Sequence, residues 1–105
     1  MKRGAAGMDV ALELMSECGN ISVADLMSNG RQQHAVSCRY LLFRFMYEDL
    51  FWSTPRIGRF FNRNHATVIH GIKQARDYIS LPSYENERSI NDDFIERLLI
   101  HENEN

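Results

Sequence analysis

STPRIGRFFNRNHATVIH, residues 53–70, is the stretch of this sequence that decides the fold. Ser53 or Thr54 suits the N-cap of a short helix, and Pro55 suits its first turn, where no backbone N–H is needed. Asn64 suits the N-cap of a second helix that follows after a tight turn. Two short helices in this arrangement predict a helix-turn-helix, whose second helix is free to enter a DNA major groove.

The second helix of this pair has an apolar back and a polar front. Its apolar residues recur at helical spacing and are expected to face the core, namely Val68, Ile72, Ala75 and Ile79. By subtraction, the outer face holds His65, Thr67, His70, Lys73 and Gln74. A groove-reading helix needs this arrangement, because its polar first turn must meet the ligand.

Four further helices are predicted around the pair. Apolar residues recur at helical spacing over residues 9–18, 22–27, 34–51 and from Ser89 onward. The third segment is the richest in large apolar side chains, so we expect it at the centre of a bundle, with Arg39 and Arg44 directed to solvent or a ligand. No strand alternation occurs. The predicted fold class is all-α: a compact helical bundle containing a helix-turn-helix, with an added C-terminal helix.

The length of 105 residues favours a single folded domain. We predict a flexible tail over residues 1–7, the helix-turn-helix domain over residues 8–80, and a linker followed by an acidic amphipathic helix over residues 81–105. Leu81-Pro82 stops the preceding helix, and the polar residues 83–88 favour a linker. The last residues of the chain, 101–105, are expected to fray.

The charges are unevenly distributed along the chain. Residues 31–76 hold eight basic and two acidic side chains, a net charge of +6, whereas the rest of the chain carries −8. The overall charge of −2 alone gives no sign of a nucleic-acid partner. The concentration of basic residues around the helix-turn-helix does indicate one.

Several other functions are disfavoured by the sequence. Cys18 and Cys38 have neither metal-ligand spacing nor a disulfide framework, and we expect buried free thiols. His65 and His70 lie five residues apart, which is not the spacing of paired helical metal ligands. No nucleophile stands beside a recognisable base, so we expect no enzyme activity, metal or cofactor. The absence of a secretory signal and of an apolar run of about 18–20 residues predicts a cytoplasmic protein and no membrane partner.

The sequence from about Asp9 to Ile79 resembles the C-terminal DNA-binding domain of the bacterial chromosomal replication initiator, DnaA. Residues 23–28 followed by Arg31 resemble its short helix and basic loop, and residues 35–39 resemble the start of its central helix. The segment from Arg63 to His70 resembles its signature, Gly-Arg-Asp-His-Thr-Thr-Val-hydrophobic-His. The resemblance covers about two thirds of the chain, and it implies binding to double-stranded DNA.

The resemblance also implies roles for individual residues. Arg31 matches the loop residue that enters the minor groove, and Arg39 matches a central-helix arginine that contacts DNA. The residues that contact bases and phosphates at the tip of the family's recognition helix are matched here by Asn64, His65, Ala66 and Thr67. His70 matches a residue that contacts the DNA backbone. With Arg63 and Lys73 as further phosphate anchors, the predicted DNA-binding residues are Arg31, Arg39, Arg63, Asn64, His65, Ala66, Thr67, His70 and Lys73.

The chain departs from the family pattern at several positions. Asn64 replaces the usual acid, Ala66 replaces the first threonine, Tyr40 stands where glutamine is common, and the loop before Arg63 is one residue shorter. No phosphate-binding loop of the form Gly-x-x-x-x-Gly-Lys-Ser/Thr occurs. We therefore expect a free-standing, sequence-specific DNA-binding domain without ATPase activity, with a replication-related or regulatory role.

Alternatives remain open at this point. The helical fold could serve as a protein-interaction module that binds a protein partner through the same face. In the C-terminal helix, Phe94, Leu98 and Leu99 are expected to pack on the bundle, although they could instead bind a second copy or another protein. The acids of this helix could also cover the basic face.

Overall fold

The computed structural model describes residues 5–104, and within that range the fold is all-α. The helices are α1 (Ala5–Gly19), α2 (Val23–Met27), α3 (Gln33–Glu48), α4 (Thr54–Phe61), α5 (His65–Ser80) and α6 (Glu85–Glu104), with a short 3₁₀ turn η1 (Pro82–Tyr84) between the last two. The predicted fold class is confirmed.

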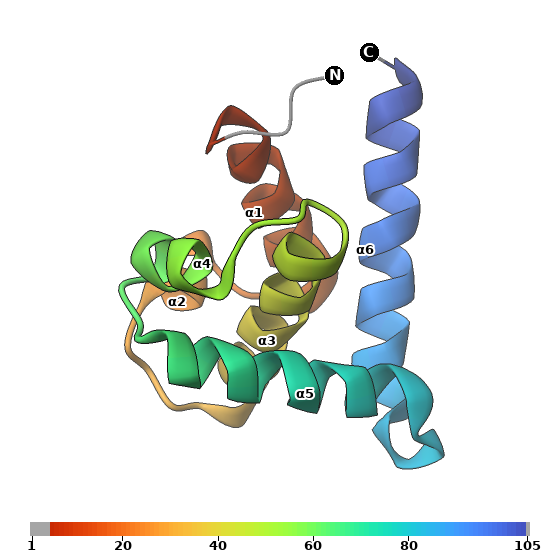
Figure 1. Ribbon diagram of the computed structural model, residues 1–105. Helices are drawn as coiled ribbons and strands as arrows, with labels where there is room; N and C mark the ends of the chain where they lie inside the picture. The colour runs from red at the N-terminus through yellow and green to blue at the C-terminus, as the bar shows by residue number, and fades with distance from the viewer. Residues whose placement is uncertain (1–4, 105) are drawn as a thin grey trace.

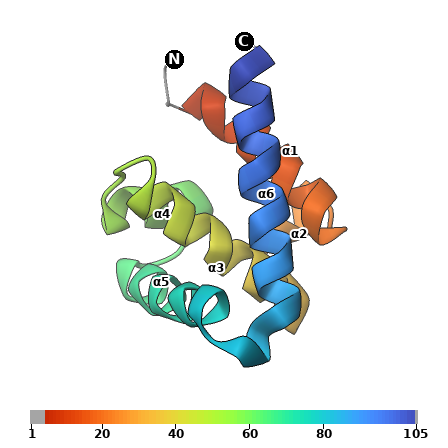
Figure 2. The same cartoon turned by 90° about the vertical axis from the view of Figure 1, so that its right-hand side faces the viewer.

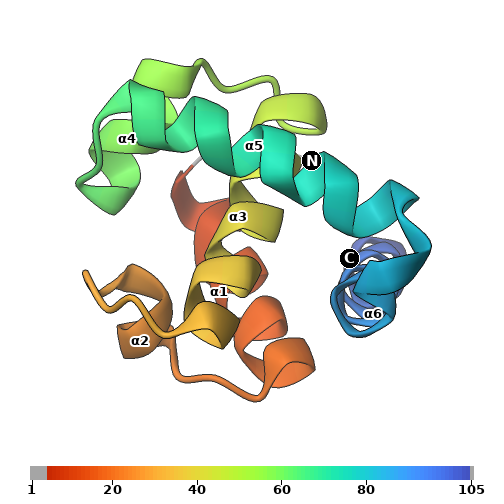
Figure 3. The same ribbon diagram turned by 90° about the horizontal axis from the view of Figure 1, so that it is seen from below.

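Helix α3 lies at the centre of the bundle, as its apolar composition predicts. Helix α5 crosses α3, and α6 runs along α1 on the side away from α4 (Figure 1). The view from the side shows α6 in front of α1 and α3 (Figure 2). From below, α5 spans the molecule from α4 at one end to α6 at the other (Figure 3).

Aromatic side chains of α3 join the two halves of the core. The ring of Phe43 meets Phe61 of α4 edge-on, with centroids 5.0 Å apart. Phe45 meets Phe94 of α6 in the same manner at 5.2 Å. All four are at least 96% buried. Such ring pairs stabilise the folded state beyond the burial of their apolar area. Through them, α3 holds both the helix-turn-helix and α6 against a single core.

The predicted ends of the chain need correction. Of the predicted tail over residues 1–7, residues 5–7 belong to α1, and residues 1–4 lie outside the described residues. The predicted linker over residues 83–88 is wrong, because η1 and the first turn of α6 occupy it. Acidic Glu85 and Glu87 in that first turn favour the helix through its macrodipole. The end expected to fray is helical as far as Glu104.

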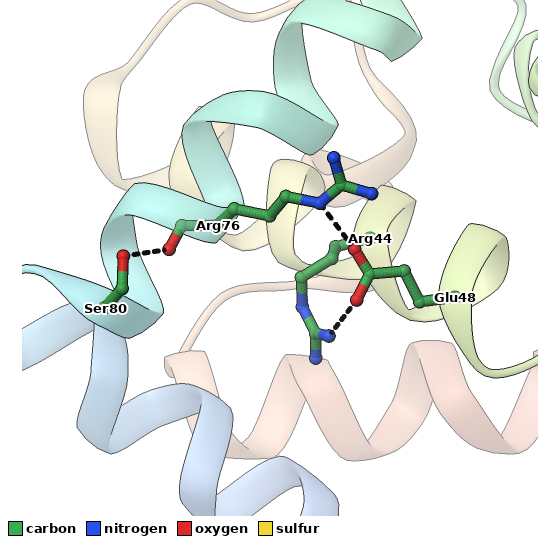
Figure 4. A network of polar contacts seen from close by, with 4 residues as sticks. All are labelled: Arg44, Glu48, Arg76 and Ser80. Carbon is green, nitrogen blue, oxygen red and sulfur yellow. Dashed lines mark hydrogen bonds and ion pairs between the residues drawn. The ribbon is translucent and has the colours of Figure 1, made fainter.

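One carboxylate of α3 receives two arginines (Figure 4). Arg44 of the same helix lies 3.0 Å from the Oε1 atom of Glu48, and Arg76 of α5 lies 2.6 Å from its Oε2 atom. Arg44, which the sequence directs to solvent or a ligand, is instead largely buried and pairs with a carboxylate. Burial alone would raise the pKa of Glu48, but the hydrogen bonds from Arg76 and Arg44 outweigh it and lower the pKa.

Replacing Glu48 with Gln is expected to reduce the free energy of unfolding by about 1–3 kcal/mol at neutral pH, because the half-buried Arg44 guanidinium loses its counter-charge. The pKa of Glu48 is lowered in the folded state, so its stabilisation is present above the ordinary Glu value of about 4.3 and is lost as the pH falls. Urea unfolding at several pH values measures both effects.

The matched control for Glu48 is Glu17→Gln. Glu17 pairs with Arg97 at 2.9 Å, but its side chain is 61% exposed. An exposed pair contributes about 0.2–1 kcal/mol, so this variant should stay close to the wild type. Equal losses of stability in the two variants, or a Glu48→Gln loss that persists at acid pH, would contradict the account of the shared carboxylate.

Candidate nucleic-acid interface

The helix-turn-helix is held by local capping bonds that the sequence predicts. The Ser53 hydroxyl accepts a hydrogen bond from the backbone N–H of Arg56 at 3.2 Å, and the Asn64 side-chain oxygen accepts one from Thr67 N–H at 2.9 Å. Asn62 ends α4 in the left-handed conformation, with φ of 56°. These bonds confirm both predicted N-caps and set the angle at which α5 leaves the turn.

A glycine allows the two helices of the pair to approach each other closely. The backbone N–H of Arg63 donates to the carbonyl oxygen of Gly58 at 2.7 Å. A Cβ atom added at Gly58 would lie 2.5 Å from the carbonyl oxygen of Arg63. A side chain at position 58 is therefore incompatible with the observed turn.

The sequence directs Arg39 to solvent or a ligand, and the structure contradicts the solvent alternative, because Arg39 is buried. Its Nε atom donates to the carbonyl of Leu26 at 2.8 Å, and its terminal nitrogens donate to the carbonyls of Asp25 at 3.0 Å and Gly30 at 3.4 Å. The residue is only 4% exposed. Carbonyls in the last turn of a helix lack internal N–H donors, and the last-turn carbonyls of α2 attract the guanidinium inward. The carbonyl of Asp25 also accepts from the hydroxyl of Ser28 at 2.9 Å.

Arg63 holds the other side of the same loop. Its Nη1 atom donates to the side-chain oxygen of Asn29 at 2.7 Å and to the carbonyl of Phe61 at 3.0 Å. Its Nη2 atom donates to the carbonyl of Ser28. Arg63 therefore connects the turn of the helix-turn-helix to the loop over residues 28–31, which carries Arg31.

These contacts surround a hollow with a volume of about 410 Å³, which we call the arginine hollow. It is lined by Asn29, Gly30, Arg31, Val36, Arg39, Tyr40, Phe43, Arg63 and Thr67. Four of the predicted DNA-binding residues thus meet at one place although they come from a loop, α3, the turn and α5. Burial lowers the pKa of Arg39, and the nearby charge of Arg63 lowers it further.

The other predicted residues lie along α5. Asn64, His65 and Ala66 are exposed at its start, and Lys73 is exposed farther along. The ring of His70 packs edge-on against Tyr40, with centroids 5.8 Å apart. Gln74, expected on or near the outer face, is half-buried and lies 3.5 Å from the Tyr84 hydroxyl. Four of these predicted residues, from Asn64 to Thr67, thus lie at the start of α5, and His70 and Lys73 follow over the next two turns.

Two residues that shape this surface were missed by reasoning from the sequence. The sequence indicates no role for Asn29 in this surface, yet its side-chain oxygen accepts a hydrogen bond from Arg63. The sequence marks Tyr40 only as a departure from the family pattern, yet it lines the arginine hollow and its ring packs against that of His70. Neither role has a local signal, because the partners lie at least thirty residues away in the sequence.

The acidic helix α6 does not cover this surface. It packs on α1, where Arg97 lies 2.9 Å from the Glu17 carboxylate, and it lies across the molecule from the start of α5 (Figure 1). Phe94 is fully buried and Leu98 is half-buried, which confirms their packing on the bundle. Leu99, which the sequence also predicts to pack there, is instead 56% exposed, and its neighbour Ile100 is 50% exposed.

Two further features bear on the kind of site. Among the side chains of the described part of the chain, no group of three or more His, Cys, Asp or Glu residues is arranged to hold a metal ion. No helix within residues 5–104 has the length and apolar character needed to cross a membrane. Cys18 and Cys38 are free thiols, and burial raises the pKa of Cys38 to about 11.

Comparisons with known proteins match the same region of the chain. The family model described as the bacterial dnaA protein helix-turn-helix matches residues 9–75. The chain is 40% identical over 70 residues to the chromosomal replication initiator protein DnaA of Wolbachia sp. subsp. Brugia malayi and to that of Wolbachia pipientis wMel, which is 66% of this chain and 15% of each relative. It is 30% identical over 76 residues to the DnaA protein of Leptospira biflexa serovar Patoc, which is 72% of this chain and 17% of that relative.

Proposed function

This chain belongs to the bacterial DnaA helix-turn-helix family, and from that premise we propose that it binds double-stranded DNA in a sequence-specific manner through α4 and α5. We further propose a replication-related or regulatory role in the cytoplasm, with no ATPase activity in this chain. The chain spans only 15–17% of the length of the relatives it matches, so their activity as whole proteins is not transferred to it.

One observation supports the proposal most directly. The loop that carries Arg31 and the exposed first turn of α5 lie on the same side of the molecule (Figure 3), and both contribute to the arginine hollow. A recognition helix placed in the major groove brings such a neighbouring loop to the adjacent minor groove, where arginine is the favoured side chain. The loop that carries Arg31 and the first turn of α5 could therefore contact neighbouring grooves of the same duplex.

The proposed roles divide between anchoring and reading. Phosphates are contacted by Arg31, Arg63, His70 and Lys73, and Arg39 contributes its charge from the wall of the hollow. Bases are read in the major groove by Asn64, His65, Ala66 and Thr67 at the start of α5. Arg39 and Arg63 also hold the loop in place through their carbonyl contacts. The position of Arg31 relative to α5 thus depends on both of them.

The salt dependence of binding tests the anchoring roles. Affinity for a random duplex should fall steeply between about 50 and 200 mM salt, because each neutralised phosphate adds about 0.9 to the slope of log K against log salt. Replacing Lys73 with Ala should reduce that slope by about 1 and weaken binding uniformly across sequences. Fluorescence anisotropy at several salt concentrations measures the slope.

Arg97→Gln serves as the control, since Arg97 lies on the α1–α6 side and pairs with Glu17 and Asp93. Its slope should equal that of the wild type. If no duplex is bound at low salt, the DNA-binding proposal fails, and a protein partner for the same face becomes the better explanation. If both variants change the slope equally, Lys73 is not a specific anchor.

A further inference from the structure

Residues 29 and 30 form the only Asn-Gly pair in the sequence. An asparagine loses its side-chain amide most readily before glycine, because glycine has no Cβ atom to obstruct closure of a succinimide ring. Both residues are exposed and lie in the loop between α2 and α3. A loop of this kind lets its backbone rotate and admits water, and the loss of the amide needs both.

The hydrogen bonds of this loop prepare both reacting groups. The backbone N–H of Gly30 donates to the Ser28 hydroxyl at 3.1 Å, so an acceptor stands where the amide proton must leave. The Nη1 atom of Arg63 lies 2.7 Å from the side-chain oxygen of Asn29. A guanidinium at that oxygen stabilises the negative charge that develops when the neighbouring carbon is attacked.

We propose that Asn29 is a site of spontaneous deamidation, which replaces its amide by a carboxylate beside Arg63. The backbone nitrogen of Gly30 attacks the Cγ atom of Asn29, and the Cγ–Nδ2 bond breaks. The amide proton of Gly30 leaves with Nδ2 as ammonia, and a succinimide remains. Water then hydrolyses this ring, which gives aspartate when the bond to Cγ opens and isoaspartate when the bond to the main-chain carbonyl opens.

The new carboxylate would stand among positive charges. Three arginines and no acidic side chain occur among the described residues that line the arginine hollow. Burial and then the nearby charge of Arg63 lower the pKa of Arg39, so the two guanidinium groups repel each other. A carboxylate within reach of Arg63 reduces that repulsion, and it keeps the hydrogen bond that the Asn29 oxygen already accepts.

The effect of deamidation on DNA binding rests on the proposed function. The amide of Asn29 is neutral, whereas a carboxylate at position 29 offsets the charge of Arg63, which is proposed to contact phosphate. An isoaspartate also lengthens the backbone of the loop that carries Arg31. Deamidation would therefore act as a slow, irreversible loss of DNA affinity that advances with the age of the protein.

The first experiment follows deamidation of the purified chain at neutral and mildly alkaline pH by mass spectrometry of its peptides. Asn29 should be converted faster than the six other asparagines that have a following residue, because each of those residues carries a Cβ atom. Gly30→Ala should slow the conversion and keep the fold, since its new Cβ atom would meet only the Ser28 hydroxyl. The proposal is overturned if Asn29 is converted no faster than the other asparagines, or if Gly30→Ala leaves its rate unchanged.

The second experiment uses Asn29→Asp to represent the product and Asn103→Asp as its control. Asn103 is exposed near the end of α6, across the molecule from the turn between α4 and α5 (Figure 1), so the control adds the same charge elsewhere. The unfolding temperature of Asn29→Asp should exceed that of the wild type above the ordinary aspartate pKa of about 3.9. The gain should be lost as the pH falls, because Arg63 lowers the pKa of the new carboxylate in the folded state.

Asn103→Asp should show no such gain, since a negative charge is unfavourable at a helix C-terminus. Equal unfolding temperatures for the two variants would overturn the pairing with Arg63.

The third experiment measures duplex binding against salt concentration for the same variants. Asn29→Asp should reduce the slope of log K against log salt by about 1, because one phosphate-neutralising charge is offset, and Asn103→Asp should leave it unchanged. Conversion of Asn29 without a change in the slope would overturn its effect on DNA. Absence of duplex binding in the wild type would defeat the proposed function, whereas the mass spectra and the unfolding temperatures would still decide the modification.

Discussion

Replacing Gly58 with Ala should reduce the free energy of unfolding by about 1–3 kcal/mol or more and should weaken any DNA binding. The new Cβ atom would lie 2.5 Å from the backbone oxygen of Arg63, and a backbone atom cannot rotate away as a side chain can. Relief requires the turn to open, which moves the start of α5 away from the loop that carries Arg31. A loss of this size lowers the unfolding temperature by roughly 4–8 °C per kcal/mol in a domain of about 100 residues.

Gly30→Ala is the matched control for this substitution. A Cβ atom at Gly30 would meet only the Ser28 hydroxyl, at 3.1 Å, and that side chain can move. The backbone of Gly30 has no positive φ angle, so alanine fits its conformation. Calorimetry measures the unfolding temperature of both variants, and we expect a clear decrease for Gly58→Ala only. Equal unfolding temperatures would mean that the close approach of the two helices is not a constraint on the turn.

The double substitution His65→Ala and Thr67→Ala is expected to have the largest effect on DNA affinity. Removing one base-reading side chain should cost roughly 1–3 kcal/mol, so affinity for the preferred site should fall at least tenfold while affinity for random duplexes changes little. The preferred site is first obtained by selecting bound sequences from a random duplex pool. Binding of the selected and scrambled duplexes by both proteins then gives the specificity ratio.

Stability should not explain that loss of affinity. His65 is exposed, and the capping bond to Thr67 uses its backbone N–H, which alanine keeps. Ser80→Ala at the far end of α5 provides a variant of the same helix that should bind as the wild type does. Base reading by the tip of α5 is disproved if the wild type and the double variant both bind selected and scrambled duplexes equally.

The sequence predicts the parts of this molecule that local chemistry determines. Ser53 and Asn64 cap helices as expected, because an N-cap needs only a short polar side chain and the N–H groups that follow it. Ser22 caps α2 in the same way. The central place of α3 follows from its apolar faces. The sequence predicts that the last helix starts at Ser89, whereas α6 starts at Glu85. The difference arises because the polar first turn of α6 resembles a linker when only hydrophobicity is considered.

The sequence predicts tertiary partners poorly. Arg44 and Glu48 are four residues apart on one helix, whereas Arg76 joins them from 28 positions away. The sequence directs Arg39 to solvent or a ligand, yet its partners are backbone carbonyls, which every residue possesses and no sequence pattern marks. The arginine hollow depends on such contacts, so its lining residues were named singly without being placed together.

The capping bond of Asn64 has a consequence for the choice of base pair. Its amide oxygen is turned toward the backbone of Thr67, at 2.9 Å, so the amide nitrogen occupies the place where an aspartate in the same rotamer would hold its second oxygen. The group presented to the groove thereby changes from acceptor to donor. If α5 reads bases as proposed, a cytosine amino group would lose its partner, and the O6 or N7 atom of guanine, the N7 atom of adenine or the O4 atom of thymine would gain one. Under the proposed base reading, we therefore expect position 64 to prefer a base that accepts a hydrogen bond over one that donates it.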